Sequence, residues 1–180
     1  MNNQLMLSRT STRWLFAAIA TICVALLGAA YFLQYGPGQQ QPCPLCILQR
    51  YAYLAIALVA LIAAVIGPER LGAMLVSGVL GLFAAIGGAL AIWQVSKGDS
   101  MASCLNDPVG QFVYALPMRN WWPEFLAAYG GCADKYPPVF GVSVPVWSLV
   151  WFAVLLAVCE LMLVKLLKKT RRTEGIRHLD

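Results

Sequence analysis

The sequence predicts an all-α membrane protein with four transmembrane helices in an antiparallel bundle. Of its 180 residues, 60% are hydrophobic and only 12% are charged, and the mean hydropathy is +0.69. A soluble domain carries roughly a quarter charged residues, so this composition argues against a soluble globular fold. The apolar residues gather in four long blocks, each near the roughly 20 residues that cross a hydrocarbon core. Because backbone polar groups in lipid must find partners within their own segment, these blocks are expected to be helices.

The limits of the blocks follow from charges, turns and prolines. No charged residue occurs from Trp14 to Gln49. The sequence Gly67-Pro68-Glu69-Arg70 is typical of a tight turn between antiparallel helices, and Pro145 suits the first turn of a helix. The expected spans are residues 14–33, 46–66, 71–95 and 145–164, within a single membrane domain of residues 1–180.

The third span is rich in glycine. Small residues at this density predict close packing against neighbouring helices, whereas a nucleotide-binding loop would need a preceding strand and polar surroundings. The glycines are Gly72, Gly78, Gly81, Gly87 and Gly88.

The distribution of lysine and arginine predicts the orientation in the membrane. Two arginines precede the first span, one lies in the short turn, and six basic residues fall in residues 165–180, against only three in the long loop before the fourth span. Because basic residues accumulate on the cytoplasmic side, both termini are expected to be cytoplasmic. Loops 34–45 and 96–144 are then expected on the exported side.

The six cysteines divide into two groups. Cys23 and Cys159 lie inside the expected spans, where they read as ordinary buried residues. The other four fall on the exported side or at its membrane edge, and they are Cys43, Cys46, Cys104 and Cys132. Exported cysteines tend to pair, and four of them allow three connectivities, of which Cys43 with Cys46 is the most local. A structural zinc site would need a second closely spaced pair, so no metal is expected.

Cys43 and Cys46 lie where a helix is expected to begin, in the sequence Pro42-Cys43-Pro44-Leu45-Cys46. A two-residue spacing makes a short, redox-labile disulfide, and the unpaired N–H groups of a first helical turn stabilise a thiolate. Arg50 follows Cys46 by four residues and therefore shares its helical face. An arginine at the membrane boundary is costly unless it reaches the interface or serves a site.

This combination resembles the disulfide-bond formation protein B (DsbB) family, quinone-coupled thiol oxidases of the bacterial inner membrane. The resemblance covers roughly Trp14 to Lys165 and rests on four spans, the Cys43/Cys46 motif, Arg50, and a distant cysteine pair in the second exported loop. The segment Tyr129 to Asp134 and the later Pro145-Val146-Trp147 also read like the family.

The resemblance implies a thiol relay that supports disulfide formation in exported proteins. A reduced periplasmic thioredoxin-fold oxidase of the DsbA type would attack the Cys104–Cys132 disulfide at Cys104, and Cys132 would then attack Cys43. Cys46 would pass the electrons to ubiquinone or menaquinone and so restore the Cys43–Cys46 disulfide. Arg50 would polarise the quinone, and Gln94 stands in the region where some members have a histidine, so it is a weaker candidate for the same contact.

The segment from Met118 to Leu126 is aromatic and lightly charged. It is expected to form a short helix on the exported surface of the membrane, in contact with lipid and with no role in binding nucleic acid, and a plain packed loop is the alternative.

Two alternative functions remain. A vitamin K epoxide reductase-like quinone reductase uses the same chemistry, although its CxxC motif follows the loop cysteines, whereas here the motif precedes them. A non-enzymatic bundle whose disulfides only staple its loops is the second alternative.

Overall fold

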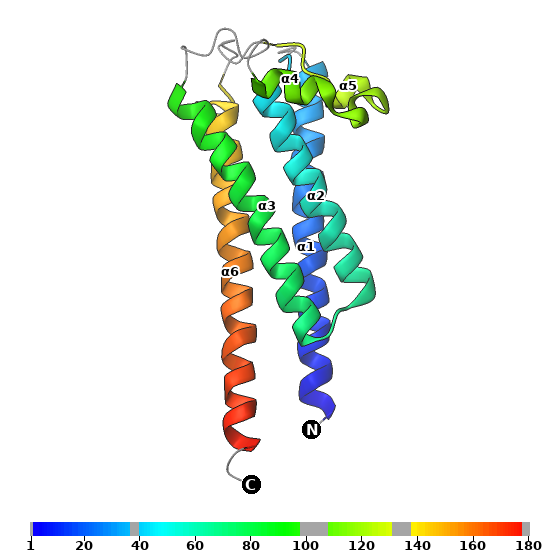
Figure 1. Cartoon of the computed structure of the whole chain (residues 1–180), viewed down its shortest axis with the longest axis vertical. Coiled ribbons are helices and arrows are strands. Elements are labelled where there is room, and N and C mark those ends of the chain that lie inside the picture. The colour runs from blue at the N-terminus through cyan, green and yellow to red at the C-terminus, as the bar shows by residue number, and fades with distance from the viewer. Residues whose placement is uncertain (1, 37–39, 98–107, 131–137, 178–180) are drawn as a thin grey trace.

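Four long helices form the protein, as Figure 1 shows. The computed structural model describes residues 2–36, 40–97, 108–130 and 138–177. The long helices are α1 (Asn2–Tyr35), α2 (Pro44–Ile66), α3 (Arg70–Lys97) and α6 (Val144–Arg177). Their segments long and apolar enough to span a membrane are Thr10–Tyr35, Pro44–Ile66, Arg70–Ser96 and Val144–Lys168. The predicted all-α architecture with four spanning helices is confirmed.

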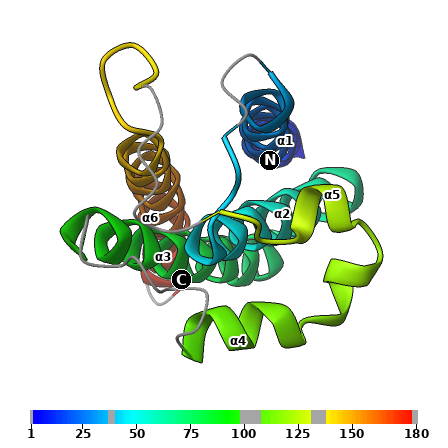
Figure 2. The same ribbon diagram turned by 90° about the horizontal axis from the view of Figure 1, so that it is seen from above.

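The helices alternate in direction and pack in chain order. α1 packs on α2, α2 on α3, and α3 on α6. Seen from above, α1 and α6 lie toward the same side of the α2 and α3 pair (Figure 2). About half of the α2 span is buried inside the protein, against 22–28% of the other three spans. α2 is therefore the central helix.

α1 begins and α6 ends at the same end of the bundle (Figure 1). The opposite end holds the start of α2 and the short helices of the long loop, and we call it the CxxC end. This arrangement agrees with two termini on one side of a membrane. Which side that is, and the treatment of the whole chain as a single domain, stay predictions.

The turn between α2 and α3 is fixed by a glycine and an arginine. Gly67 has φ 62°, a left-handed conformation that favours glycine, and its N–H donates to the Ala63 carbonyl at 2.9 Å. Arg13 of α1 donates from Nε to the Ala64 carbonyl at 2.9 Å. A cation at the carbonyl end of a helix is favourable, and this one also ties α1 to α2.

Close packing through glycine is confirmed at part of the predicted stripe in α3. A Cβ atom at Gly87 would lie 2.3 Å from the ring of Phe152 in α6, so only glycine admits this ring. The same ring stacks on Tyr53 of α2, with ring centroids 4.1 Å apart. In contrast, a Cβ atom at Gly78 would meet nothing within 4 Å, so Gly78 does not contribute to this packing.

Three short helical segments lie at the CxxC end (Figure 1), namely α4 (Pro108–Ala115), the 3₁₀ turn η2 (Pro117–Asn120) and α5 (Pro123–Leu126). The expected helix over residues 118–126 is therefore split into η2 and α5, and α4 was not predicted. Trp122 adopts φ −145° and ψ 71°, because the residue before a proline is disfavoured in the helical region. Pro123 then starts α5.

Candidate functional site

The first turn of α2 is capped by one cysteine of the pair. Cys43 is the N-cap residue, with φ −83° and ψ 166°, and Pro44 occupies the first helical turn, where its missing N–H costs nothing. The Cys43 Sγ accepts a hydrogen bond from the Cys46 backbone N–H at 3.3 Å, as a serine or aspartate oxygen does in other helices. The Cys-Pro-Leu-Cys sequence therefore builds its own helix start.

The two sulfur atoms lie together in a small cluster of apolar side chains. The Cys43 Sγ and Cys46 Sγ atoms are 2.8 Å apart, Cys43 is 2% exposed, and Cys46 is half-buried. Leu45, Leu90 of α3 and Val109 of α4 pack around them. The hydrogen bond with Cys46 and the burial of its side chain raise the pKa of the Cys43 thiol.

A chain of two glutamine amides reaches the sulfur atoms. The Gln94 Nε2 atom donates to Cys43 Sγ and to Cys46 Sγ, at 3.3 Å in each case. Its Oε1 atom accepts a hydrogen bond from the Gln49 Nε2 atom at 2.8 Å. The structure thus brings Gln94 to the cysteine pair itself, whereas the sequence suggested only a quinone contact.

Arg50 is buried at the same end, and its guanidinium group joins three elements. Nη1 donates at 2.8 Å both to Gln34 Oε1 in α1 and to the Phe125 carbonyl in α5, and Nη2 donates to the Ala30 carbonyl at 3.4 Å. The group also lies over the Phe125 ring, 4.9 Å from its centroid. Among the described residues, the partners of this charge are thus an amide oxygen, backbone carbonyls and an aromatic ring.

The end of α1 holds α5 in place. Gln34 Nε2 donates to the Glu124 carbonyl at 2.7 Å, and the Tyr35 hydroxyl donates to the same oxygen at 2.9 Å. Together with Arg50, these bonds fix the loop through its backbone carbonyls.

The chain after α5 pairs with the residues before Cys43. The backbone N–H groups of Tyr129 and Gly130 donate to the Pro42 carbonyl at 3.0 Å and 3.1 Å. A Cβ atom at Gly130 would lie 2.4 Å from the Gln41 carbonyl oxygen, so this approach requires glycine. The loop is thereby fastened one residue before Cys43.

Buried polar side chains concentrate around the cysteine pair. Among the described residues, four of the five buried polar or charged side chains lie at the CxxC end, and these are Gln34, Gln49, Arg50 and Gln94. The sequence analysis missed Gln34 and Gln49. Gln49 lies inside the expected second span, where an uncharged polar side chain must find a partner, whereas Gln34 directly follows the expected first span and carried no such signal.

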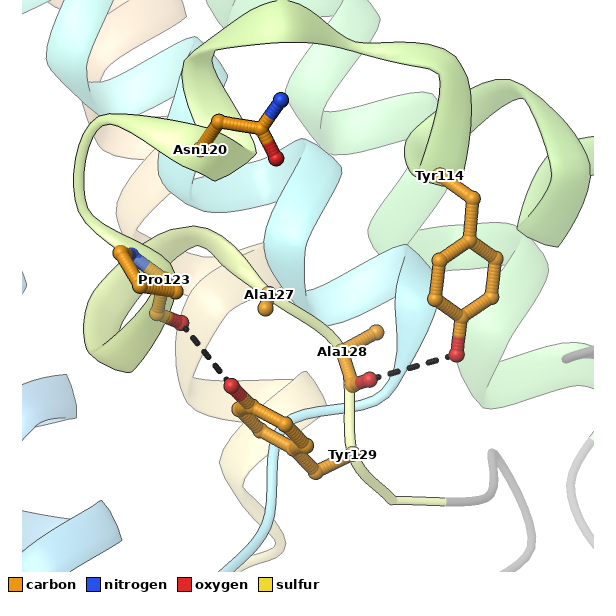
Figure 3. Close-up of a pocket in the computed structure, with 6 residues that line it drawn as sticks. All are labelled: Tyr114, Asn120, Pro123, Ala127, Ala128 and Tyr129. Atoms are coloured by element: carbon orange, nitrogen blue, oxygen red, sulfur yellow. Dashed lines mark hydrogen bonds between the residues drawn. The ribbon is translucent and has the colours of Figure 1, made fainter.

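A cavity of about 370 Å³ lies within the long loop, apart from the cysteine pair. Figure 3 shows Tyr114 and Tyr129 on two sides of it, their hydroxyl groups donating to the carbonyls of Ala128 and Pro123 at 3.4 Å and 3.5 Å. Asn120 and Ala127 complete its lining. None of the predicted site residues that the structure describes lines this cavity. The candidate site is therefore the cysteine pair in the first turn of α2 and not this cavity.

The other predicted cysteines are divided by the structure. Cys23 and Cys159 are buried in the apolar core, as predicted. Cys104 and Cys132 lie outside the described residues, so their pairing with each other stays a prediction. The pairing of Cys43 with Cys46 and the absence of a metal stay predictions as well.

The sequence matches known proteins over most of its length. The family model described as disulfide bond formation protein DsbB matches residues 12–162. A disulfide bond formation protein B from Ralstonia nicotianae is 38% identical over 168 residues, which cover 91% of this chain and 99% of that protein. Proteins of the same name from Cupriavidus pinatubonensis and Nitrosomonas europaea are 40% and 36% identical, covering 82% and 78% of this chain and 89% and 86% of theirs. The chain therefore belongs to the DsbB family of disulfide bond formation proteins.

Proposed function

We propose that this protein is a quinone-dependent thiol oxidase that reoxidises a DsbA-like, thioredoxin-fold partner and so supports disulfide formation in exported proteins. The observation that carries the proposal is the buried cysteine pair at the start of a spanning helix, contacted by Gln94 and close in sequence to a buried arginine. A disulfide that only stapled a loop would need no such donors, and a bridge of this spacing closes too small a loop to add much stability.

The first exchange takes place at the long loop. The two thiols of the partner reduce the Cys104–Cys132 disulfide, with the attack at Cys104, and the partner leaves as a disulfide. The loop dithiol next reduces the Cys43–Cys46 disulfide, with Cys132 attacking Cys43 and Cys46 leaving as the thiolate. Each exchange moves two electrons and keeps the number of disulfides constant.

The docking of the loop supports the second exchange. The Gly130 N–H donates to the Pro42 carbonyl, Cys132 follows Gly130 by two positions, and Cys43 directly follows Pro42. Two extended residues reach about 7 Å, so the chain after Gly130 is long enough for Cys132 to attack Cys43 as proposed. The Gln94 Nε2 donor, 3.3 Å from the Cys46 Sγ atom, would stabilise Cys46 as the leaving thiolate.

The donors at the CxxC end suit a quinone carbonyl. The contacts of the Arg50 guanidinium group use both hydrogens of Nη1 and one of Nη2. Within the part of the chain that the structure describes, Nε and the second hydrogen of Nη2 remain as donors. A bound quinone would accept the two electrons of the Cys43/Cys46 dithiol. Arg50 would orient it, and Gln94 would stabilise the thiolate that faces it.

The expected location is the bacterial inner membrane, with both termini in the cytoplasm and the CxxC end facing the periplasm. The basic residues at the other end of the bundle support this orientation. Tryptophans 121 and 122 are exposed on the loop, which agrees with an interfacial position near the membrane surface.

The test is quinone reduction by the purified full chain, followed by ultraviolet absorbance after addition of a reduced thioredoxin-fold oxidase. We expect turnover that is abolished by Cys46→Ala and weakened by Arg50→Ala. Cys159→Ala, which removes a buried thiol far along α6, is the matched control and should keep its turnover. Absence of turnover by the wild type with both ubiquinone and menaquinone, or full turnover by Cys46→Ala, would overturn the proposal.

A further inference from the structure

Gln49 lies one helical turn after Cys46, and its hydrogen bond goes to Gln94 rather than to a sulfur atom. Its side chain is 5% exposed, and its Nε2 atom donates to Gln94 Oε1 at 2.8 Å. Gln94 is 8% exposed and bridges from Gln49 to both sulfur atoms. Two buried side-chain amides thus form one hydrogen-bonded chain that ends at the cysteine pair.

The hydrogen bond from Gln49 selects one of two orientations of the Gln94 amide. An amide has a donor end and an acceptor end, and the two ends have nearly the same shape. With Oε1 occupied by Gln49, the NH₂ group of Gln94 faces the sulfur atoms. While Gln49 keeps its NH₂ group toward Gln94, as in the structure, the reverse orientation of Gln94 would point a carbonyl oxygen at the sulfurs and set two NH₂ groups against each other.

This orientation matters most for the reduced pair. A thiolate is a strong hydrogen-bond acceptor, whereas a disulfide sulfur is a weak one, so a donor at this place stabilises the reduced form more than the oxidised form. Because Gln94 reaches both sulfurs at the same distance, it serves whichever sulfur carries the charge. Stabilising the reduced form raises the reduction potential of the pair.

We propose that Gln49 is a positioning residue that fixes the amide of Gln94 with its donor end toward the cysteines and thereby makes the Cys43/Cys46 pair more oxidising. A more oxidising pair accepts electrons from the loop cysteines more readily. The importance of this effect in the protein rests on the proposed function, but the effect itself does not.

The test is the equilibrium of the Cys43–Cys46 disulfide with glutathione, measured in the detergent-solubilised full chain without partner or quinone. Two glutathione thiols reduce the disulfide and leave as glutathione disulfide, and alkylation followed by mass spectrometry counts the free thiols. Cys104→Ser and Cys132→Ser are present in all samples, so that only this pair responds.

We expect Gln49→Met, which keeps the size of the side chain and removes its donor, to lower the equilibrium constant for reduction about tenfold. A tenfold change corresponds to about 30 mV for a two-electron couple. Loss of one hydrogen bond to a charged group has about this size. Gln49→Asn, whose amide is one methylene too short to reach Gln94, should act in the same direction and replaces Gln49→Met if that variant does not fold.

A double-mutant cycle separates positioning from a general structural effect. Gln94→Met should lower the equilibrium constant at least as far as Gln49→Met, and Gln49→Met should add nothing in the Gln94→Met background. Ser77→Ala, a buried polar change elsewhere in α3, should leave the constant unchanged. An unchanged constant in both folded Gln49 variants, or an equal loss from Gln49→Met with and without Gln94, would overturn the inference.

The result is independent of the quinone assay. A shifted glutathione equilibrium in a protein without quinone turnover would keep the inference and reject the proposed function. Normal turnover with an unshifted equilibrium would do the reverse.

Discussion

The contact between Gly130 and the chain before Cys43 yields a quantitative prediction. An alanine Cβ at this position would begin 2.4 Å from the Gln41 carbonyl oxygen, and the gap must widen to at least 3.0 Å. Because the neighbouring atom belongs to the backbone, the chain segments around Gly130 and Gln41 must move apart. The hydrogen bonds from Tyr129 and Gly130 to Pro42 are then lost or strongly lengthened. Two neutral hydrogen bonds contribute about 1–3 kcal/mol together. Gly130→Ala should therefore lower the equilibrium constant for docking of the loop by about 5- to 150-fold.

Hydrogen–deuterium exchange of the peptide containing Tyr129 and Gly130 measures this change directly, since both amides are protected only while they are bonded to Pro42. We expect faster exchange in Gly130→Ala, together with slower electron transfer from the partner to the Cys43/Cys46 pair. Gly28→Ala is the matched control, because a Cβ atom at Gly28 would meet nothing within 4 Å. If exchange at Tyr129 and Gly130 were the same in Gly130→Ala as in the wild type, the loop would not depend on this contact and the reasoning would be wrong.

Two further predictions concern the packing of the spanning helices. Gly87→Ala should lower the free energy of unfolding by about 1–3 kcal/mol, because its Cβ would overlap the Phe152 ring. Gly78→Ala in the same helix places its Cβ in open space and should be neutral or slightly stabilising. Thermal unfolding in one detergent compares the two variants, and equal melting temperatures would contradict the prediction. Tyr53→Phe removes the hydroxyl group that donates to the Ser148 carbonyl at 3.1 Å but keeps the stacked ring. The free energy of unfolding should therefore fall by about 1 kcal/mol in the same assay. A decrease as large as that of Tyr53→Ala would show that the ring rather than the hydroxyl had been disturbed.

The fold could be predicted from the sequence because the apolar blocks are long, uninterrupted by charge and bounded by a clear turn. Where the prediction was less accurate, the reason is local. α1 and α6 continue as helices beyond the apolar residues, since helix propensity does not stop at a membrane boundary. The split between η2 and α5 depends on the non-helical backbone conformation of Trp122. The only indication of this conformation in the sequence is the proline that follows.

The candidate site was predictable where its residues are neighbours in the chain. Cys43, Cys46 and Arg50 share one helix, so spacing alone places them near one another. The contacts of Arg50 with Gln34 and Phe125 join residues 16 and 75 positions away, and one of the acceptors is a backbone carbonyl. Every residue type carries a backbone carbonyl, so the sequence does not indicate which one accepts the hydrogen bond from Arg50. The role of Gln94 at the sulfur atoms likewise requires the packing of α2 on α3.

The order of the helices along the chain has a consequence for how the protein is made. Gln34, the cysteine pair, Gln49, Arg50 and Gln94 all belong to the first three helices, and each of these helices packs on its neighbour in sequence. None of the described hydrogen bonds of these side chains involves α6. A chain emerging from the ribosome folds from its N-terminus, so the cysteines can meet their amide partners while the last helix is still being synthesised. The contacts around the cysteine pair would then form before α6 packs on α3. The packing of α6 would complete the core around Phe152 and would not be needed to assemble the site.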